Sequence, residues 1–167
     1  MDFKYSTPAD IPKPEPVQIL KVFPENLFRA FTRSHIRLDE FHRMRLKGEY
    51  SYDYVATEEG LINPYDGTSA PPNGLVLKPL GFDLCEQTAK FRKNARVQMI
   101  PAGTRVTEDL QLVKYSSGVY CLETIVTRDV ISLDVVLSRF VHQFEIMSRK
   151  EFFSRYFING KLKTPTL

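Results

Sequence analysis

The order of apolar and polar positions along this chain predicts a mixture of short strands and helices. Strand-like apolar runs occur at residues 27–32 and 96–100. Two more runs, residues 110–115 and 119–127, flank residues 116–118 (SSG), a composition typical of a hairpin turn. We therefore expect an antiparallel hairpin in the second half of the chain.

Helical spacing of apolar residues predicts two helices in the first hundred residues. The first runs over residues 36–46, with Ser34 as its N-cap and Gly48 as its stop signal. The second covers about residues 84–94, because the four residues that begin at Asp83 match a capping box.

A third helix is predicted near the C-terminus. Ser132 precedes a series of apolar residues at helical spacing, which indicates a long amphipathic C-terminal helix. Strands with interspersed helices and a late hairpin indicate an α+β fold with a split, curved β-sheet core and flanking helices. The apolar face of the third helix would hold Leu133, Val136, Leu137, Phe140, Val141, Phe144 and Met147.

The length of 167 residues suits a single domain. Its N-terminal part is rich in proline, since residues 6–24 contain five of the 11 prolines. Proline fixes its own φ and lacks an N–H donor, so this part favours an extended or disordered arm without a regular ladder. We therefore divide the chain into a proline-rich arm, residues 1–21, and one domain, residues 22–167.

Composition and charge narrow the class of protein. The formal net charge of +3 comes from mixed basic and acidic residues, so no clear nucleic-acid patch is expected. The N-terminus lacks the apolar region of a signal peptide, and no apolar run is long enough to span a membrane. We expect a protein that is cytoplasmic at synthesis, with Cys85 and Cys121 reduced and no metal site.

Three short motifs carry the most specific information. They are residues 27–31 (LFRAF), residues 60–69 (GLINPYDGTS) and residues 98–104 (QMIPAGT). In this order and with these gaps, the motifs resemble those of the ADP-ribosyltransferase-like toxins of the type VI secretion effector class, the Tse-two type. That family reads roughly L-[YF]-R-A, then G-L-x-x-P-x-x-G-T-S, then V-I-P-x-G-T-x-[IV]. The resemblance spans about residues 22–147, most of the chain.

The resemblance implies an ADP-ribosyltransferase-like fold and an NAD-dependent mono-ADP-ribosyltransferase-like toxin or effector that acts in the cytoplasm of a target cell. NAD would be its substrate, and the target that receives ADP-ribose would be a macromolecule or a small molecule. The resemblance also implies delivery into another cell and a cognate immunity protein. Two alternatives stay open: a catalytically inactive binding module on the same fold, and an RNA 2′-phosphotransferase-like NAD enzyme.

The first two motifs supply most of the predicted site. The resemblance assigns Arg29 to the NAD phosphates, and it assigns Thr68 and Ser69, with Gly67, to the wall of the ribose pocket. Periodicity alone favours simpler interpretations. Arg29 would then lie on the wet face of an edge strand, and the two hydroxyls would bond to local backbone.

Glu123 completes the predicted catalytic set with Ser69 and Arg29. It lies in a strand otherwise made of core-type residues, and the resemblance implies that its charge acts at the ribose carbon as nicotinamide leaves. The alternative is a solvated acid, or an acid paired with Lys114 across the hairpin. Arginine-modifying transferases place Gln or Glu two residues earlier, where this chain has Cys121, which argues against an arginine target.

Two further residues belong to the predicted NAD site. Lys114 is a candidate for holding the pyrophosphate, although a hairpin lysine is most often solvated. Tyr65 lies inside the second motif and ranks first among the tyrosines that could stack on an NAD ring. The four tyrosines considered are Tyr52, Tyr54, Tyr65 and Tyr115.

Overall fold

The structure is a computed structural model that describes seven stretches of the chain. They are residues 16–32, 38–47, 53–65, 73–91, 94–116, 118–158 and 161–162. Gly67, Thr68 and Ser69 lie outside the described residues, so the roles predicted for these three residues stay predictions.

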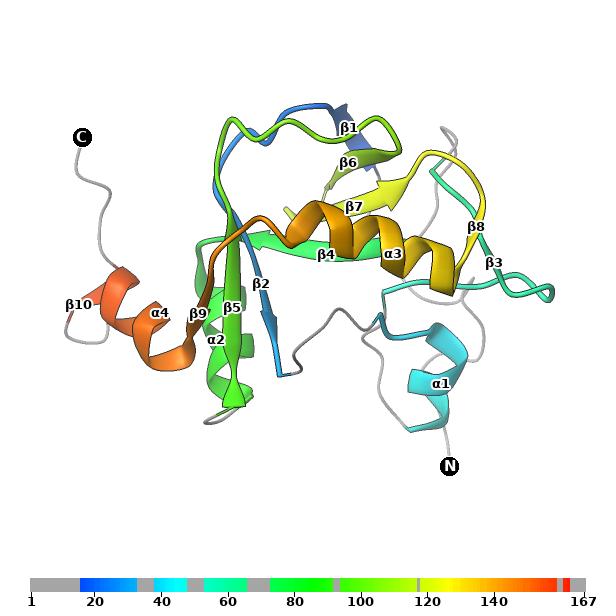
Figure 1. Cartoon of the computed structure of the whole chain (residues 1–167). Helices are drawn as coiled ribbons and strands as arrows, with labels where there is room; N and C mark the ends of the chain where they lie inside the picture. The colour runs from blue at the N-terminus through cyan, green and yellow to red at the C-terminus, as the bar shows by residue number, and fades with distance from the viewer. Residues whose placement is uncertain are drawn as a thin grey trace.

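Seven strands form one antiparallel sheet in the order β1-β6-β7-β4-β2-β5-β9 (Figure 1). Two short pairs, β3 with β8 and β10 with β11, form separate two-stranded sheets. The strands of the large sheet are β1 (Pro16–Leu20), β2 (Leu27–Phe31), β4 (Gly74–Pro79), β5 (Arg96–Ile100), β6 (Leu110–Tyr115), β7 (Tyr120–Thr124) and β9 (Ile146–Ser148). The short strands are β3 (Leu61–Ile62), β8 (Arg128–Asp129), β10 (Phe157–Ile158) and β11 (Lys161–Leu162). The helices are α1 (Phe41–Leu46), α2 (Phe82–Lys90), α3 (Val130–Val141) and α4 (Arg149–Tyr156).

Strand β4 joins the two halves of the large sheet. Residues 74–77 pair with β7, whereas Lys78 and Pro79 pair with Phe28 and Leu27 of β2. In Figure 1, β4 runs across the view while β2 and β5 run steeply downward. The direction of the sheet therefore changes at β4, and β2 separates from β4 beyond Phe28.

Glycine at position 74 allows β4 to approach β7 closely. A Cβ atom built there would lie 2.2 Å from the backbone carbonyl oxygen of Leu122, which has no room to move within the ladder. Gly74 is the register partner of Glu123. The absence of a side chain at Gly74 thus lets the strand that follows the second motif pair directly beside Glu123.

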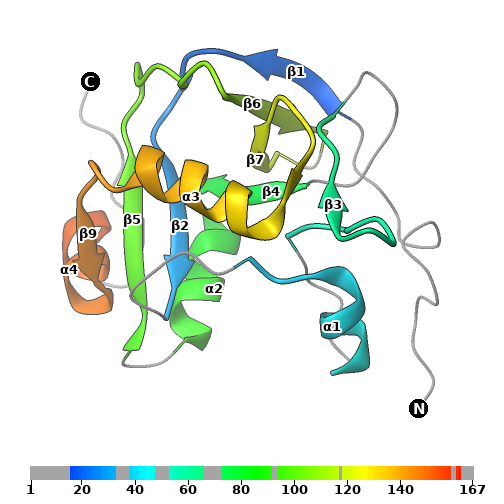
Figure 2. The same ribbon diagram turned by 45° about the vertical axis from the view of Figure 1, so that its right-hand side comes forward.

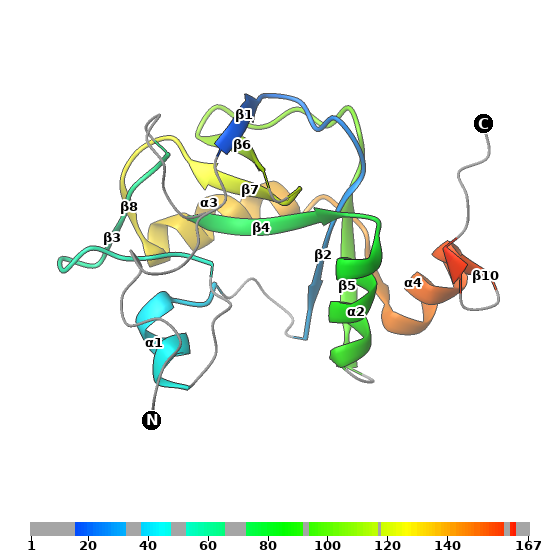
Figure 3. The same ribbon diagram turned by 180° about the vertical axis from the view of Figure 1, so that it is seen from behind.

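Helices cover both faces of the sheet. Helix α3 lies across one face (Figure 2), and α2 lies against β2 on the other face (Figure 3). Residues in the strands alternate between the two faces, so one set of side chains packs with α3 and the other set packs on the far side. The core on the α3 side includes Leu27, Leu75, Leu77, Leu112, Tyr120, Leu122, Leu133, Leu137 and Phe140. The far side of β2 and β5 packs Phe28, Leu84, Val97, Met147 and Phe152.

The sequence-predicted strands and the α+β class are confirmed. Residues 27–31 form β2 and residues 96–100 form β5. The predicted hairpin forms β6 and β7, with pairs that run from Leu110 opposite Thr124 to Lys114 opposite Tyr120.

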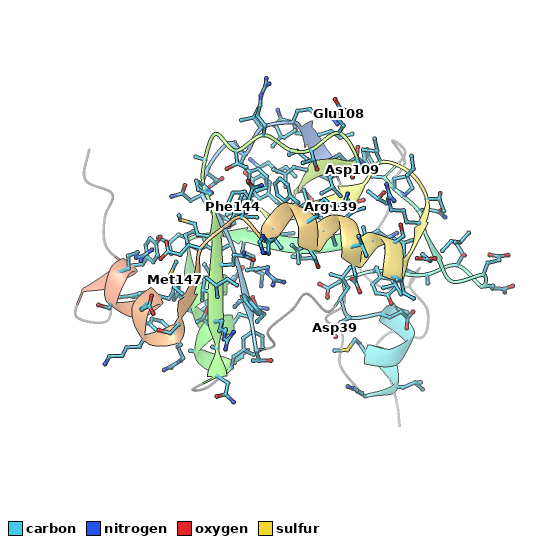
Figure 4. All side chains as sticks on the ribbon, viewed as in Figure 1. Asp39, Glu108, Asp109, Arg139, Phe144 and Met147 are labelled. Atoms are coloured by element: carbon cyan, nitrogen blue, oxygen red, sulfur yellow. The ribbon has the colours of Figure 1, made fainter. Side chains whose placement is uncertain are left out.

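The prediction of one long C-terminal helix is wrong. Helix α3 ends at Val141, and Met147 belongs to β9, where it pairs with Val97 of β5. Figure 4 shows Phe144 and Met147 beyond the end of α3. Nε2 of Gln98 donates to the carbonyl oxygens of Val141 and Phe144, at 2.7 and 3.1 Å. These bonds satisfy carbonyls that a continuing helix would use itself, and the last helix, α4, has only eight residues.

The predicted helix starts also need correction. Helix α3 begins with Asp129 as its N-cap, because this carboxylate accepts the N–H of Ser132 at 2.7 Å. Helix α2 begins at Phe82 after Gly81, with no side-chain cap, so the predicted capping box at Asp83 is wrong. Asp83 lies in the first turn instead, where a negative charge favours the helix dipole.

The first helix is shorter than predicted. Helix α1 covers only Phe41–Leu46, and the predicted cap Ser34 and stop Gly48 lie outside the described residues. Among the helices that the structure describes, none has the length and apolar character needed to cross a membrane.

Part of the proline-rich arm belongs to the sheet. Pro16–Leu20 forms β1 and pairs with β6, so the expectation that the prolines prevent a ladder is wrong for this part. Proline is tolerated at the first residue of an edge strand and at a bulge. Pro16 is the first residue of β1, and the register shifts between Pro16 and Gln18. Residues 1–15 lie outside the described part of the chain.

Candidate active site

Glu123 is a buried acid in the middle of the sheet. Every residue of β7 is buried, and the side chain of Glu123 is only 1% exposed. Its neighbours at alternate positions, Tyr120 and Leu122, belong to the core under α3, so Glu123 and Cys121 face the opposite side. The alternative interpretation of Glu123 as a solvated acid, or as an acid paired with Lys114, is wrong.

Two tyrosines hold the carboxylate of Glu123. The hydroxyl of Tyr115 on β6 donates a 2.5 Å hydrogen bond to Oε2, and the backbone N–H of Tyr65 donates a 3.3 Å bond to Oε1. Short bonds from a hydroxyl to an oxygen are typical of an ionised acceptor. The two tyrosines therefore bind different oxygens of Glu123, and the bond to Oε2 is the shorter one.

Burial and hydrogen bonding act on the pKa of Glu123 in opposite directions. Burial raises the pKa of this carboxyl above its usual value, and bonds from Tyr115, Tyr65 and Asn73 oppose that rise. Burial, followed by the charge of Glu123, raises the pKa of Tyr115 and that of Cys121. Both neighbours thus stay neutral and can donate to the carboxylate.

Gln111 holds the backbone of Tyr65 from the other side. It is the register partner of Glu123 on β6, and its Nε2 donates to the carbonyl oxygen of Tyr65 at 3.4 Å. Glu123 accepts the N–H of the same residue. A cross-strand pair of polar side chains thus binds both backbone groups of Tyr65.

Residues on both sides of the motif stretch, which we define as residues 66–72, bond to this carboxylate. Tyr65 precedes the stretch that contains Gly67, Thr68 and Ser69, and Asn73 follows it. The backbone of Asn73 also hydrogen-bonds the Glu123 carboxyl and lowers its pKa, in the same direction as Tyr65. Glu123 therefore binds the described residue on each side of the motif stretch.

Arg29 lies on β2, which has β4 on one side and β5 on the other in the sheet order. Strand β4 pairs only with Leu27 and Phe28, so at Arg29 the strand pairs, among the described strands, with β5 alone. The expected edge position therefore holds locally, although the side chain is half-buried rather than fully exposed. Its Nε donates to Oε1 of Gln98 at 3.1 Å, and its guanidinium lies 4.1 Å from the centre of the Phe31 ring. Gln98 in turn binds the end of α3, which places Arg29 on the α3 side of the sheet.

The charge of Arg29 persists at neutral pH. Burial lowers its pKa to about 10, and the negative charge of Asp53 opposes this fall. Asp53 accepts the N–H of Asp39, a residue that lies below α3 in Figure 4, at 2.6 Å. Asp53 also raises the pKa of Cys121, so its field reaches both Arg29 and the strand of Glu123.

The structure does not bring Arg29 and Glu123 together on one face of the sheet. Arg29 faces α3, whereas Glu123 faces away from it. The two strands are separated by β4, and Arg29 lies one residue beyond Phe28, the last residue of β2 that pairs with β4. Asp53 lies near this fork, because its backbone oxygen accepts the N–H of Gly74 at the start of β4.

The remaining predicted residues lie in different environments. Lys114 is half-buried on the α3 side of the hairpin, with Nζ 5.8 Å from the centre of the Tyr120 ring. Tyr54 is part of the buried core, which argues against a stacking role, and Tyr52 lies outside the described residues. Among the described tyrosines, Tyr65 and Tyr115 contact Glu123.

Sequence reasoning did not assign roles to Gln98, Gln111 and Asp53. A signal for the two glutamines was present, because each is a polar residue inside an otherwise apolar strand. The hairpin turn at residues 116–118 also fixes the register that places Gln111 opposite Glu123. Asp53 had no such signal, since its neighbours come from distant parts of the chain.

Two surface hollows lie elsewhere on the molecule. One, of about 450 Å³, lies between α3 and the loop before β6, where Figure 4 labels Glu108, Asp109 and Arg139. The other, of about 490 Å³, lies beside β5 and β9 and includes Met147. Neither hollow is lined by a residue of the predicted site. The described residues contain no group of His, Cys, Asp and Glu that could hold a metal ion.

Comparison with known proteins agrees with the resemblance seen in the motifs. A family model described as the Tse2 ADP-ribosyltransferase toxin matches residues 25–152, a range that contains Arg29, Tyr65 and Glu123. No curated protein and no solved structure matches the chain. Transferases of this kind use NAD as the donor of ADP-ribose. Since the match covers well over half of its length, the chain belongs to the Tse2 ADP-ribosyltransferase toxin family.

Proposed function

We propose that this protein is an NAD-dependent mono-ADP-ribosyltransferase that acts as a toxin in the cytoplasm of a target cell. The observation that carries the proposal is the buried carboxylate of Glu123, bound to Tyr65 at the described edge of the second motif. An acid with a raised pKa and specific hydrogen-bond donors is typical of a catalytic site. Membership of a toxin family supports the delivery of this protein into target cells and the prediction of a cognate immunity protein.

The reaction breaks the bond between the ribose carbon C1′ and the nicotinamide nitrogen. The electron pair of this bond leaves with nicotinamide, whose ring loses its positive charge, and positive charge develops at C1′. A nucleophile on the target then forms a bond to C1′ and loses its proton to solvent or a base. Negative charge placed near C1′ stabilises the transition state, and this is the role that we assign to Glu123.

The weaker hydrogen bond of Glu123 marks the oxygen that substrate would reach. Oε2 is held by Tyr115 at 2.5 Å, whereas Oε1 has the 3.3 Å bond from the Tyr65 backbone. A carboxylate oxygen can accept two hydrogen bonds, so Oε1 would accept a ribose hydroxyl beside the Tyr65 N–H. Thr68 and Ser69, with Gly67, would form the ribose wall, because the motif stretch starts and ends beside Glu123.

Arg29 suits the diphosphate of NAD because it is positively charged and because neighbouring side chains hold its guanidinium in place. Its pKa of about 10 keeps it cationic at neutral pH, and Gln98 and Phe31 fix the direction of the guanidinium. A planar fork of donors suits phosphate oxygens. Because Arg29 and Glu123 face different sides of the sheet, we propose that NAD spans the fork between β2 and β4. Lys114, on the α3 side of the hairpin, and the Tyr65 ring remain proposed contacts.

A second candidate function is a binding module that has lost NAD cleavage. The observation in its favour is the enclosure of Glu123, which is 1% exposed and has donors on both oxygens. In this case the carboxylate would serve only to fix the ends of the motif stretch. The toxin would then act through contacts with its target rather than by chemistry.

One experiment separates the two functions. Purified protein is incubated with NAD, nicotinamide release is measured, and labelled NAD is used to detect ADP-ribose on a cell lysate. The enzyme predicts release by wild type and a loss of label with Glu123→Gln. The binding module predicts growth arrest in cells without nicotinamide release or label, and that result would overturn the proposal.

A further inference from the structure

The strongest contact of the Glu123 carboxylate is the one to Tyr115. The two residues lie on neighbouring strands, β6 and β7, and both side chains are buried on the face away from α3. The 2.5 Å bond joins the hydroxyl of Tyr115 to Oε2. Sequence reasoning considered Tyr115 only as a ring for stacking, but its ring is 1% exposed and is packed with Val113 and Cys121.

We propose that Tyr115 is a positioning residue for Glu123, which fixes Oε2 and directs Oε1 toward the Tyr65 side of the site. This inference rests on the proposed function, because it assigns Tyr115 a part in the same reaction. Tyr115 acts through Glu123 and does not contact substrate.

The geometry explains why one donor can set the orientation of the whole group. A carboxylate is planar, so fixing Oε2 by a short bond leaves Oε1 a single direction. Oε1 then meets the backbone N–H of Tyr65, which is itself held by Gln111 at its carbonyl oxygen. Tyr115 and Gln111 lie on the same strand, four residues apart, on the same face.

The charge of the pair is consistent with a neutral donor and an ionised acceptor. The titratable groups that face this carboxylate are Tyr115 on β6 and Cys121 on β7, while the phenol of Tyr65 acts on Tyr115 and Asp53 acts on Cys121. Burial is the largest influence on Glu123 and raises its pKa, and the Tyr115 bond is the largest influence that lowers it. Removal of this hydroxyl should therefore leave the carboxylate harder to ionise.

The test is Tyr115→Phe, with Tyr120→Phe as a matched control. Tyr120 is also a buried tyrosine of this hairpin, and its hydroxyl donates to a different carboxylate, Glu25, at 2.8 Å. Both variants lose one tyrosine hydroxyl and keep the ring. Nicotinamide release from NAD is measured from about pH 5 to 9, and the Glu123 carboxyl carbon is titrated by NMR. The range brackets the pH at which a raised glutamate titrates.

In Tyr115→Phe, the acid limb of the rate profile and the Glu123 titration should both move upward by about one pH unit. The variant should have a lower kcat than wild type at low pH and a nearly normal kcat at high pH. Its KM should stay nearly unchanged. Tyr120→Phe should keep the wild-type profile. A Glu123 titration in Tyr115→Phe that coincides with wild type, or an equal shift in Tyr120→Phe, would overturn the positioning role.

A measurement on Glu123→Gln covers the case in which Tyr115→Phe does not fold. The short bond to Oε2 deshields the hydroxyl proton of Tyr115, so the NMR resonance of this proton should move upfield in Glu123→Gln relative to wild type. An unchanged hydroxyl resonance would also overturn the pairing. If wild type releases no nicotinamide, the proposed function fails, and the two NMR measurements still decide whether Tyr115 controls Glu123.

Discussion

Arg29 and Gln98 lie directly opposite each other on β2 and β5, and Nε of Arg29 donates a 3.1 Å hydrogen bond to Oε1 of Gln98. The amide of the same Gln98 donates to the carbonyl oxygens at the end of α3. One nitrogen of the guanidinium is thus used to hold the side chain in place. The bond leaves the two Nη nitrogens for other acceptors, which is the arrangement that a phosphate-binding arginine requires.

Arg29→Ala should weaken NAD binding more than it weakens the fold. Loss of charge-assisted bonds to a diphosphate should raise the Kd for NAD roughly 10- to 100-fold. The loss should be the same from about pH 6 to 9, because arginine with a pKa of about 10 stays charged over this range. Isothermal titration calorimetry with NAD, on protein shown to be folded, measures this effect.

Arg155→Ala is the matched control for the arginine. Arg155 lies on the exposed surface of α4 and pairs with Glu145 at 3.1 Å, far in sequence from the predicted motifs. Its removal should leave NAD binding unchanged. If Arg29→Ala binds NAD as wild type does, Arg29 serves only the Gln98 contact and the diphosphate role is wrong.

Removal of residues 1–20 should destabilise the protein, in contrast to what the proline content predicts. This truncation deletes β1, which pairs with β6 at four register positions and packs Leu20 against the main core. The free energy of unfolding should fall by about 2 kcal/mol, from lost ladder bonds and lost apolar burial. Chemical denaturation measures it. Removal of residues 1–15 alone is the control and should have the smaller effect, and equal stability of both truncations and full-length protein would contradict a structural role for β1.

How much of the site could be predicted from the sequence depends on the range of each interaction. Strands β2, β5, β6 and β7 follow from apolar runs and turn residues, which are local features. The register of the hairpin also follows from its turn, so the pairing of Gln111 with Glu123 could have been predicted from the sequence. The burial of Glu123 could not be predicted, because it depends on β4, where its register partner Gly74 lies 49 residues earlier in the chain.

The wrong prediction of one long C-terminal helix also results from contacts between distant parts of the chain. The apolar pattern continues at helical spacing past Val141, but the chain leaves the helix to pair β9 with β5. Gln98 stabilises this exit by binding the carbonyl oxygens there, from a strand 43 residues earlier than Val141. Such tertiary contacts override local propensity, and no window of sequence around residue 141 contains them.

The pH dependence of stability should carry the signature of the buried Glu123. Its folded-state pKa is raised, so between the ordinary value of 4.5 and the folded value the folded protein binds more protons than the unfolded chain. By linkage, the contribution of Glu123 to the free energy of unfolding falls as pH rises through that interval. The contribution is at its most favourable below about pH 4.5. Wild type should therefore gain stability relative to Glu123→Gln as pH falls from 7 to 4, measured by denaturation at each pH. A difference that stays constant, or changes in the opposite direction, would show that the hydrogen bonds outweigh burial.

Glu123→Gln should lower the rate of nicotinamide release far more than it lowers the affinity for NAD. Glutamine keeps the shape of the side chain and one oxygen that can accept the Tyr65 N–H, but it removes the negative charge. If that charge acts at C1′, its loss is felt mainly in the transition state, and kcat should fall by about 10²–10³.

Glu25→Gln is the control for this substitution, since Glu25 also accepts a tyrosine hydroxyl, at 2.8 Å, but lies outside the proposed site. Its kcat should match that of wild type. Both variants must first show the wild-type circular dichroism spectrum, because a change in a buried strand can unfold a protein for reasons unrelated to chemistry. A folded Glu123→Gln protein that releases nicotinamide as fast as wild type would remove the charge from the mechanism. The carboxylate would then act only by anchoring Tyr65 and Asn73, and the catalytic groups would have to come from the motif stretch between them.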